Sequence, residues 1–135
     1  MMETNRRTFI VGTGAALAGV AWTPMNVLSE GKTQMYGLIG KMNTVPGQRD
    51  ALIAILLEAM DKMPGCLSYI IAKDPSDENG IWITEVWDTE TSHQASLKLP
   101  SVQRAISRGK PLIAGFSNRV ETQPVGGHGL PGVQR

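Results

Sequence analysis

The order of strand-like and helix-like segments is the feature that most constrains the fold of this 135-residue chain. Residues 48–63 favour a helix, since leucine and methionine recur at three- and four-residue spacing. A second helix is expected from about residue 88 to residue 99, followed by a short helical turn at 102–108. Strands are favoured where apolar and β-branched residues alternate along a segment or fill it, at residues 35–43, 66–73, 81–87 and 116–122.

Turn residues separate these segments. Pro-Gly pairs at 46–47 and 64–65 follow the first strand and the first helix, and a polar run at 74–80 joins the second strand to the third. The resulting order is the split βαβ signature. We therefore predict an α+β domain at residues 34–123, with ferredoxin-like βαββαβ topology and an antiparallel four-stranded sheet. Residues 124–135, rich in glycine and proline, form a C-terminal tail.

The predicted sheet has apolar residues on both of its faces. Along the strand at 81–87, alternation places Trp82 and Trp87 on opposite faces, each with apolar neighbours. Two helices cover only one face, and a sheet that is apolar on both faces needs a second layer. A domain of about 100 residues also buries only about 60–70% of its unfolded surface. A second copy of the chain supplies the missing layer, so we expect a homodimer of the dimeric α+β barrel type.

Composition argues against a nucleic-acid surface and against a metal centre. The chain has a formal net charge of +1 and 5% aromatic residues, and its lysine and arginine residues do not cluster. Its single cysteine, Cys66, excludes an intrachain disulfide, and no spacing of cysteine and histidine is typical of a metal site. We therefore expect neither nucleic acid nor a metal ion as a partner.

The first 33 residues resemble an export signal followed by a linker. The pair Arg6 and Arg7 precedes a polar residue, a phenylalanine and an aliphatic residue, as in the twin-arginine (Tat) signal. The apolar segment at 11–21 is shorter than the roughly 20 residues that a membrane-spanning helix needs. We expect export of the folded protein to the periplasm or another extracytoplasmic compartment, without stable membrane insertion after signal removal. A retained hydrophobic anchor or an ordinary N-terminal helix is the alternative.

Two stretches of the chain resemble the antibiotic biosynthesis monooxygenase (ABM) family. The first, with a strand, a Pro-Gly pair and an apolar helix, is MYGLIGKMNTVPGQRDALIAILLEAM. The second, with a strand, a helix and a proline-marked turn, is IWITEVWDTETSHQASLKLPSV. The resemblance spans residues 35–123. It implies a small aromatic substrate such as a quinol, with O2 as co-substrate and no metal, flavin or haem cofactor; the family also includes many members with no shown activity.

The second helix departs from the pattern of that family. Many quinol-oxygenating members carry a histidine about nine residues after the aromatic residue that ends the strand, here Trp87, and this chain has Ser96 there. His93 lies one helical turn earlier. Haem-degrading relatives carry a tryptophan at the position of Ser96 and a histidine at the position of Ile106, so haem degradation is not expected.

Six residues are candidate site residues. His93 is the candidate catalytic base, because an imidazole exchanges protons around neutral pH; the alternative is a solvent-exposed helix histidine. Trp82 and Trp87 lie on opposite faces, so at most one of them lines a given pocket, and each has a core or interface role as its alternative. The candidate substrate contacts stack on an aromatic ring or bond to its oxygens: Tyr69, Trp82, Trp87, Asn43 and Ser96.

Glu85 lies among apolar residues of the strand at 81–87. A carboxylate in such surroundings is costly unless it is paired. Arg119 on the last strand is the expected partner in a structural ion pair, and a tuned catalytic acid is the alternative interpretation of Glu85.

The resemblance makes a cofactor-independent monooxygenase the leading functional hypothesis. The protein would supply an apolar pocket, an oriented base and hydrogen bonds to the developing quinone oxygen. Two alternatives stay open. A non-catalytic dimeric binding module for a small hydrophobic molecule needs the same apolar sheet and no base, and an isomerase or decarboxylase of the same barrel type consumes no oxygen.

Overall fold

The computed structural model describes residues 34–130; the export signal predicted for residues 1–33 lies outside this range, as do residues 131–135. The described residues form four strands, three α-helices and one 3-10 turn in the order β1 (Tyr36–Thr44), α2 (Arg49–Glu58), β2 (Cys66–Lys73), β3 (Gly80–Trp87), α3 (Glu90–Ser96), α4 (Pro100–Gly109), η2 (Lys110–Leu112) and β4 (Ile113–Thr122). This order confirms the predicted ferredoxin-like α+β fold.

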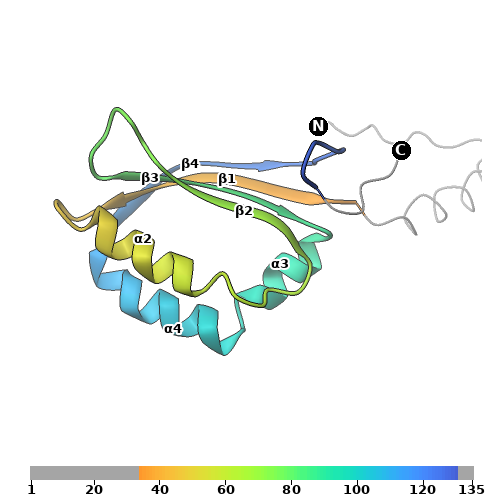
Figure 1. Cartoon of the computed structure of the whole chain (residues 1–135), viewed down its shortest axis with the longest axis horizontal. Helices are drawn as coiled ribbons and strands as arrows, with labels where there is room; N and C mark the ends of the chain where they lie inside the picture. Colours follow the sequence, from red (N-terminus) through yellow and green to blue (C-terminus); the bar gives the residue numbers. More distant parts are fainter. Residues whose placement is uncertain (1–33, 131–135) are drawn as a thin grey trace, which may run out of the picture. The chain divides into compact units, whose positions relative to one another are not determined.

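The four strands form one antiparallel sheet in the order β2-β3-β1-β4. Helices α2 and α4 lie side by side along one face of the sheet, and α3 begins directly after β3 (Figure 1). Because β1 and β3 are the central strands, the side chains that face the helices from them are the most enclosed. The residues of β3 alternate between buried and half-buried, as the period of two predicts.

Helix α2 is shorter than predicted, since it ends at Glu58 and not near residue 63. The N–H of Ala59 bonds to the carbonyl of Leu56 at 3.1 Å, a tight closing turn. Lys62 has a φ of 57°, and Pro64 disfavours helical backbone in the residue before it. The apolar spacing of the sequence continues past Glu58, but the helical backbone does not.

The second helix predicted up to about Leu99 is α3, which ends at Ser96, and the predicted restart of the chain at Pro100 is the beginning of α4. Pro100 disfavours helical backbone at Leu99, which adopts an extended conformation (φ −68°, ψ 139°) and begins α4 as its N-cap. The helical turn expected at 102–108 is therefore part of a ten-residue helix. Strand β4 begins at Ile113, three residues before the predicted start at 116. No helix between residues 34 and 130 has the combined length and hydropathy of a membrane span.

The core lies between the sheet and the helices. Leu52 of α2 is 1% exposed and packs with Ile81 and Ile83 of β3. Near the other end of β3, Trp87 is 1% exposed and packs with Tyr36. Burying a large apolar side chain in this way contributes about 1.5–3 kcal/mol to folding.

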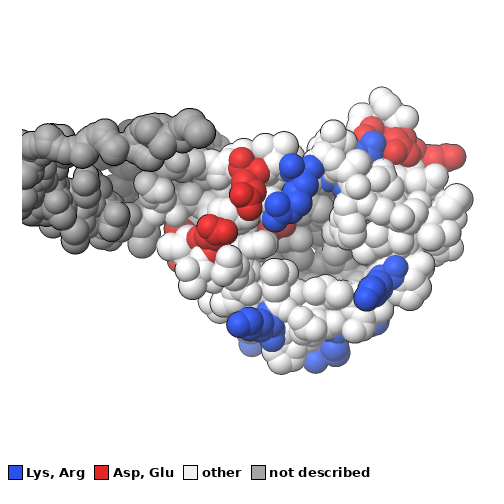
Figure 2. All heavy atoms as spheres, turned by 180° about the vertical axis from the view of Figure 1, so that it is seen from behind, with Lys and Arg blue, Asp and Glu red and all other residues white. Residues whose placement is uncertain are grey.

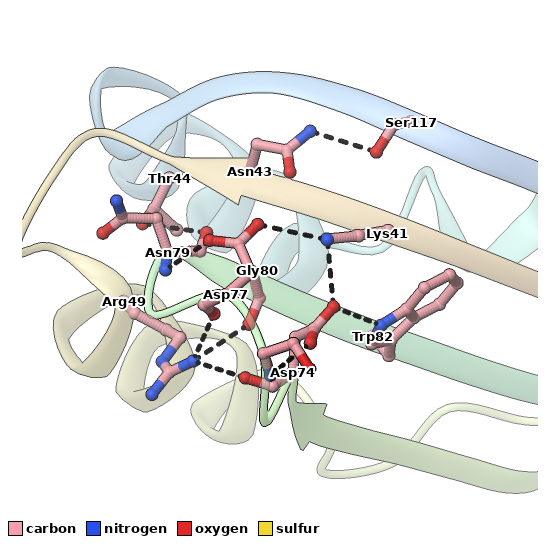
Figure 3. Close-up of polar contacts among 11 residues, drawn as sticks. Lys41, Asn43, Thr44, Arg49, Asp74, Asp77, Asn79, Gly80, Trp82 and Ser117 are labelled. Atoms are coloured by element: carbon pink, nitrogen blue, oxygen red, sulfur yellow. Dashed lines mark hydrogen bonds and ion pairs between the residues drawn. The ribbon is translucent and has the colours of Figure 1, made fainter.

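A polar network fixes the β2–β3 hairpin (Figure 3). The Nζ atom of Lys41 lies 2.9 Å from Oδ2 of Asp74 and 3.1 Å from Oδ2 of Asp77. Nη1 of Arg49, at the start of α2, donates hydrogen bonds to the carbonyls of Asp74 (3.2 Å) and Asp77 (2.8 Å). Trp82 Nε1 donates to Oδ2 of Asp74 at 2.9 Å. These contacts join β1, α2 and the hairpin loop at one end of the sheet.

The sheet face turned away from α2 and α4, here called the open face, carries a row of side chains across all four strands that is apolar except at Thr84, here called the apolar row. The register places Ile70, Thr84, Ile39 and Val120 side by side in that row. Ile70 and Val120, on the two edge strands, are 54% and 53% exposed. Large apolar side chains at this exposure suit contact with a further layer.

The first tail residues after β4 cover one end of the open face. A Cβ atom at Gly37 would lie 2.1 Å from Oγ1 of Thr122 and 2.9 Å from Cγ of Pro124, so only glycine fits there. Val125, one residue further, is 82% exposed. The tail up to residue 130 therefore leaves the apolar row of the open face accessible.

Candidate active site

A cavity of about 640 Å³ lies between the helix-facing side of the sheet and helices α2 and α4. This volume is in the range of small-molecule sites. Figure 2 shows a hollow between the sheet and the helices, with lysine or arginine side chains on either side of it. The apolar lining comes chiefly from α2, α4 and the sheet: Met42, Leu52, Leu56, Ala59, Met60, Met63, Trp87, Val102, Ala105, Ile106, Ile113 and Phe116.

His93 lines this cavity from α3. The hydroxyl of Thr89 caps α3 by accepting a hydrogen bond from the N–H of Ser92 at 3.1 Å, which starts the helix directly after β3. The ring of His93 lies beside the rings of Tyr36 and Trp87, with centroid distances of 5.3 and 5.5 Å. Its side chain is only 12% exposed, so the alternative of a solvent-exposed helix histidine is wrong.

Glu85 is the acidic group of the cavity wall and is 9% exposed. Its Oε1 atom accepts a hydrogen bond from Nε1 of Trp87 at 2.8 Å and lies 3.8 Å from Nε2 of His93. Burial raises the pKa of the Glu85 carboxyl, and the Trp87 hydrogen bond and the nearby His93 and Arg119 oppose that rise. The partner expected for Glu85 was Arg119, whose Nη1 lies instead 3.7 Å from Oε2 of Glu121.

Tyr69 of β2 lies beside Glu85 in the sheet register and also lines the cavity. Burial raises the pKa of its phenol above the ordinary value, and the nearby Glu85 adds to the effect. The hydroxyl of Tyr69 therefore stays protonated at neutral pH and is available as a hydrogen-bond donor. A smaller cavity of about 430 Å³ shares Tyr69 and Glu85 with the first, so these two residues lie where the cavities adjoin.

Ser96 is 5% exposed and lines the cavity one turn after His93. Its Oγ atom donates a hydrogen bond of 2.6 Å to the carbonyl of His93. The hydroxyl proton is thus used within the helix, which leaves the oxygen of Ser96 as its free acceptor.

Asn43 and Trp82 lie on the opposite side of the sheet. In the register their side chains share the open face with Lys41, and Nδ2 of Asn43 donates to Oγ of Ser117 at 3.1 Å (Figure 3). The structure thus brings together Tyr69, Trp87, His93 and Ser96 around the cavity, whereas Asn43 and Trp82 do not line it.

Glu85 lines the cavity, although the sequence analysis favoured a structural ion pair for it and did not include it among the candidate site residues. Its alternation with Ile83 and Trp87 indicated the helix-facing side, but its pairing was assigned to Arg119 on β4. The sequence did not show in which direction α3 leaves β3, and that direction decides that His93 is the neighbour of Glu85. Among residues 34–130, no group of three or more histidine, cysteine, aspartate or glutamate side chains is arranged to hold a metal ion.

Residues 35–108 match the family Antibiotic biosynthesis monooxygenase (ABM). A crystal structure from Chloroflexus aurantiacus J-10-fl, named as a candidate antibiotic biosynthesis monooxygenase, is 67% identical, with 71% of this chain and 98% of that chain covered and a TM-score of 0.70. No curated protein matches this chain significantly.

Two more distant structures show the same fold. A candidate antibiotic biosynthesis monooxygenase from Bacteroides thetaiotaomicron is 15% identical, with 76% of this chain and 96% of that chain covered and a TM-score of 0.62. A protein from Pseudomonas aeruginosa is 17% identical, with 70% and 98% covered and a TM-score of 0.62. The family match covers more than half of the chain, and the most identical of these structures is covered almost completely. This chain therefore belongs to the antibiotic biosynthesis monooxygenase family.

Proposed function

We propose that this protein is a monooxygenase that oxidises a quinol or a related electron-rich aromatic compound with O2, and that it needs no metal, flavin or haem. The observation that carries the proposal is the cavity of about 640 Å³, in which an apolar wall encloses one imidazole, His93, and one phenol, Tyr69. An apolar wall fits an aromatic ring, and the two polar groups suit its oxygens. The names of the relatives from Chloroflexus and Bacteroides support the same reaction class.

The proposed reaction begins when Nε2 of His93 takes the proton of a substrate hydroxyl. The resulting anion passes one electron to O2, and the substrate radical and superoxide combine at a ring carbon to form a peroxide. The C–H bond at that carbon and the O–O bond then break: one oxygen stays on the ring as a carbonyl, and the other leaves as water with the proton from that carbon and the proton that His93 returns. Tyr69, held in its protonated form, donates a hydrogen bond to the oxygen that gains negative charge.

Oxygen consumption by the purified protein with a panel of hydroquinones tests this proposal. We expect uptake above the autoxidation blank, and a loss of about 10²-fold or more in His93→Gln. His128→Gln is the matched control, because His128 is exposed and lies in the tail. No uptake above the blank with any hydroquinone would refute the proposal.

The alternatives give different outcomes in the same experiment. A binding module would bind the aromatic compound without consuming it, with an affinity nearly unchanged in His93→Gln. An isomerase or decarboxylase would consume its substrate without consuming O2.

We further propose that two copies of the chain pack through their open faces. The support is the accessible apolar row at Ile39, Ile70 and Val120, which the described part of the tail leaves uncovered. A stable interface of this kind buries roughly 1,200–2,000 Å². Light scattering coupled to gel filtration should give twice the mass of one chain; a monomer at all concentrations would refute this assembly.

The proposed route of export is the Tat pathway. A double variant that carries Arg6→Lys and Arg7→Lys should accumulate inside the cell, whereas the unchanged chain should reach the extracytoplasmic fraction. Equal export of both chains would refute a twin-arginine signal.

A further inference from the structure

Glu85 and His93 lie close enough for an ion pair but too far apart for a direct hydrogen bond. Oε1 of Glu85 and Nε2 of His93 are 3.8 Å apart, which is too long for a hydrogen bond. An oxygen atom placed beside both can lie about 2.8 Å from each, which is hydrogen-bond distance to both atoms. The pair therefore has the spacing of a site for one additional oxygen.

The surroundings hold both groups in place. Nε1 of Trp87 donates to Oε1 of Glu85 at 2.8 Å, which orients the carboxylate. The ring of His93 packs against the rings of Tyr36 and Trp87. Both side chains line the cavity, so a cavity ligand can reach the space beside them.

A structural role accounts poorly for Glu85. A buried carboxylate costs folding free energy unless close partners satisfy it. Among the described residues Glu85 has one hydrogen-bond partner, Trp87, and the nearby His93 and Arg119 offset its burial only in part, since its pKa stays raised. A carboxylate kept at such a cost on a cavity wall is typical of a functional site.

We propose that Glu85 is a catalytic residue and forms, with His93, the binding site for the reacting hydroxyl group of an aromatic ligand. When one of the two facing atoms carries a proton and the other does not, one donates a hydrogen bond and the other accepts one. A hydroxyl group both donates and accepts, and it matches this pair. In the proton-transfer step, the O–H bond of the ligand breaks and the unprotonated member of the pair gains the proton, with no oxidant needed.

This inference rests on the proposed function in placing an aromatic ligand in the cavity, but its test needs no turnover. The probes are 2-naphthol and 2-methylnaphthalene, which differ by a hydroxyl in place of a methyl group, and titration calorimetry measures their affinities. The unchanged protein should bind 2-naphthol about tenfold or more tightly than 2-methylnaphthalene, as a hydrogen bond to a charged group predicts.

The variant Glu85→Gln keeps the shape of the side chain and removes its charge. We expect it to reduce the preference for 2-naphthol about fivefold and to leave the affinity for 2-methylnaphthalene within twofold. His93→Gln removes the other member of the pair and should also reduce the preference for 2-naphthol. Glu90→Gln, which alters an exposed carboxylate on α3, is the matched control and should keep the full preference.

Three outcomes would overturn the inference. These are an equal affinity of the unchanged protein for both probes, an unchanged preference in Glu85→Gln, and a loss of affinity for both probes, which would mark Glu85 as structural. The proposed monooxygenase function and the proposed role of Glu85 can be refuted independently. A 2-naphthol preference that depends on Glu85, without oxygen uptake, would refute only the monooxygenase, and full oxygen uptake in Glu85→Gln would refute only the role of Glu85.

Discussion

Removing the charge of Glu85 should make the protein more stable at neutral pH. The carboxylate is 9% exposed, and burial is the main influence on its pKa, which is raised in spite of Trp87, His93 and Arg119. The folded state therefore favours the uncharged carboxyl more strongly than the unfolded state does. Glutamine is uncharged and still accepts the hydrogen bond from Trp87 Nε1. We expect Glu85→Gln to raise the free energy of unfolding by about 0.5–2 kcal/mol, as substitutions at strained functional sites do.

The pH dependence of this gain follows from the direction of the pKa shift. A raised carboxyl pKa means that the folded state binds the proton more tightly than the unfolded state. The wild-type protein is therefore relatively stable below the ordinary value of 4.5 and loses stability as pH rises through the raised pKa of Glu85. The stability advantage of Glu85→Gln over wild type should therefore be larger at pH 7 than at pH 4 and should disappear well below 4.5.

Urea unfolding followed by tryptophan fluorescence measures the difference, at pH 7 and pH 4 and at one protein concentration, since a dimer's stability depends on concentration. For a domain of about 100 residues, each 1 kcal/mol also raises Tm by about 4–8 °C. Glu90→Gln should change stability by less than about 0.5 kcal/mol. A loss of about 3–5 kcal/mol in Glu85→Gln at pH 7 would refute the reasoning, because that is the cost of breaking a structural buried pair.

Three further predictions concern the core, the open face and the hairpin. Leu52→Ala should lower the unfolding free energy by about 2–5 kcal/mol in urea unfolding, while Leu57→Ala, at a side chain that is 57% exposed on the same helix, should change it little. Ile39→Lys should convert the expected dimer to monomer in light scattering, because it places a charge in the apolar row. Lys41 lowers the pKa of Asp74 from 3.8 to about 2, so part of the stability is lost as pH falls from 3.8 towards 2; in Lys41→Met that pKa returns towards 3.8, and thermal unfolding should show a smaller loss of stability over the same pH range.

The order of the elements was predictable because each signal is local. Alternation along β3 correctly separated Trp82 from Trp87, and the apolar spacing of α2 correctly predicted its existence. The end of α2 was not predictable from spacing alone, because residues 60 and 63 continue the apolar pattern. The helix nevertheless ends at Glu58, and Lys62 has a positive φ. The apolar side chains beyond Glu58 line the cavity in place of extending the helix.

The site was predictable only in part, since cavity residues come from elements far apart in the sequence. His93 and Trp87 lie within one segment, and their proximity follows from a short strand-to-helix connection. Asn43 lies at the end of a strand, where a single residue of register decides which face its side chain takes, and it takes the open face. The cavity wall that α4 supplies was not predictable, because it depends on the packing of α4 against α2 and no local sequence signal indicates that packing.

We predict that the distance between Glu85 and His93 depends on one capping residue, Thr89. Thr89 accepts the hydrogen bond that begins α3, and the ring of His93 is placed by that helix. Thr89→Ala should cost about 1 kcal/mol of stability and should reduce the preference for 2-naphthol over 2-methylnaphthalene, because α3 then frays at the turn that carries His93. Thr89→Ser keeps the capping hydroxyl and should keep the preference. If Thr89→Ala shows the loss of stability with the full preference intact, the position of His93 is set by its contacts with Tyr36 and Trp87, and the cap serves the fold alone.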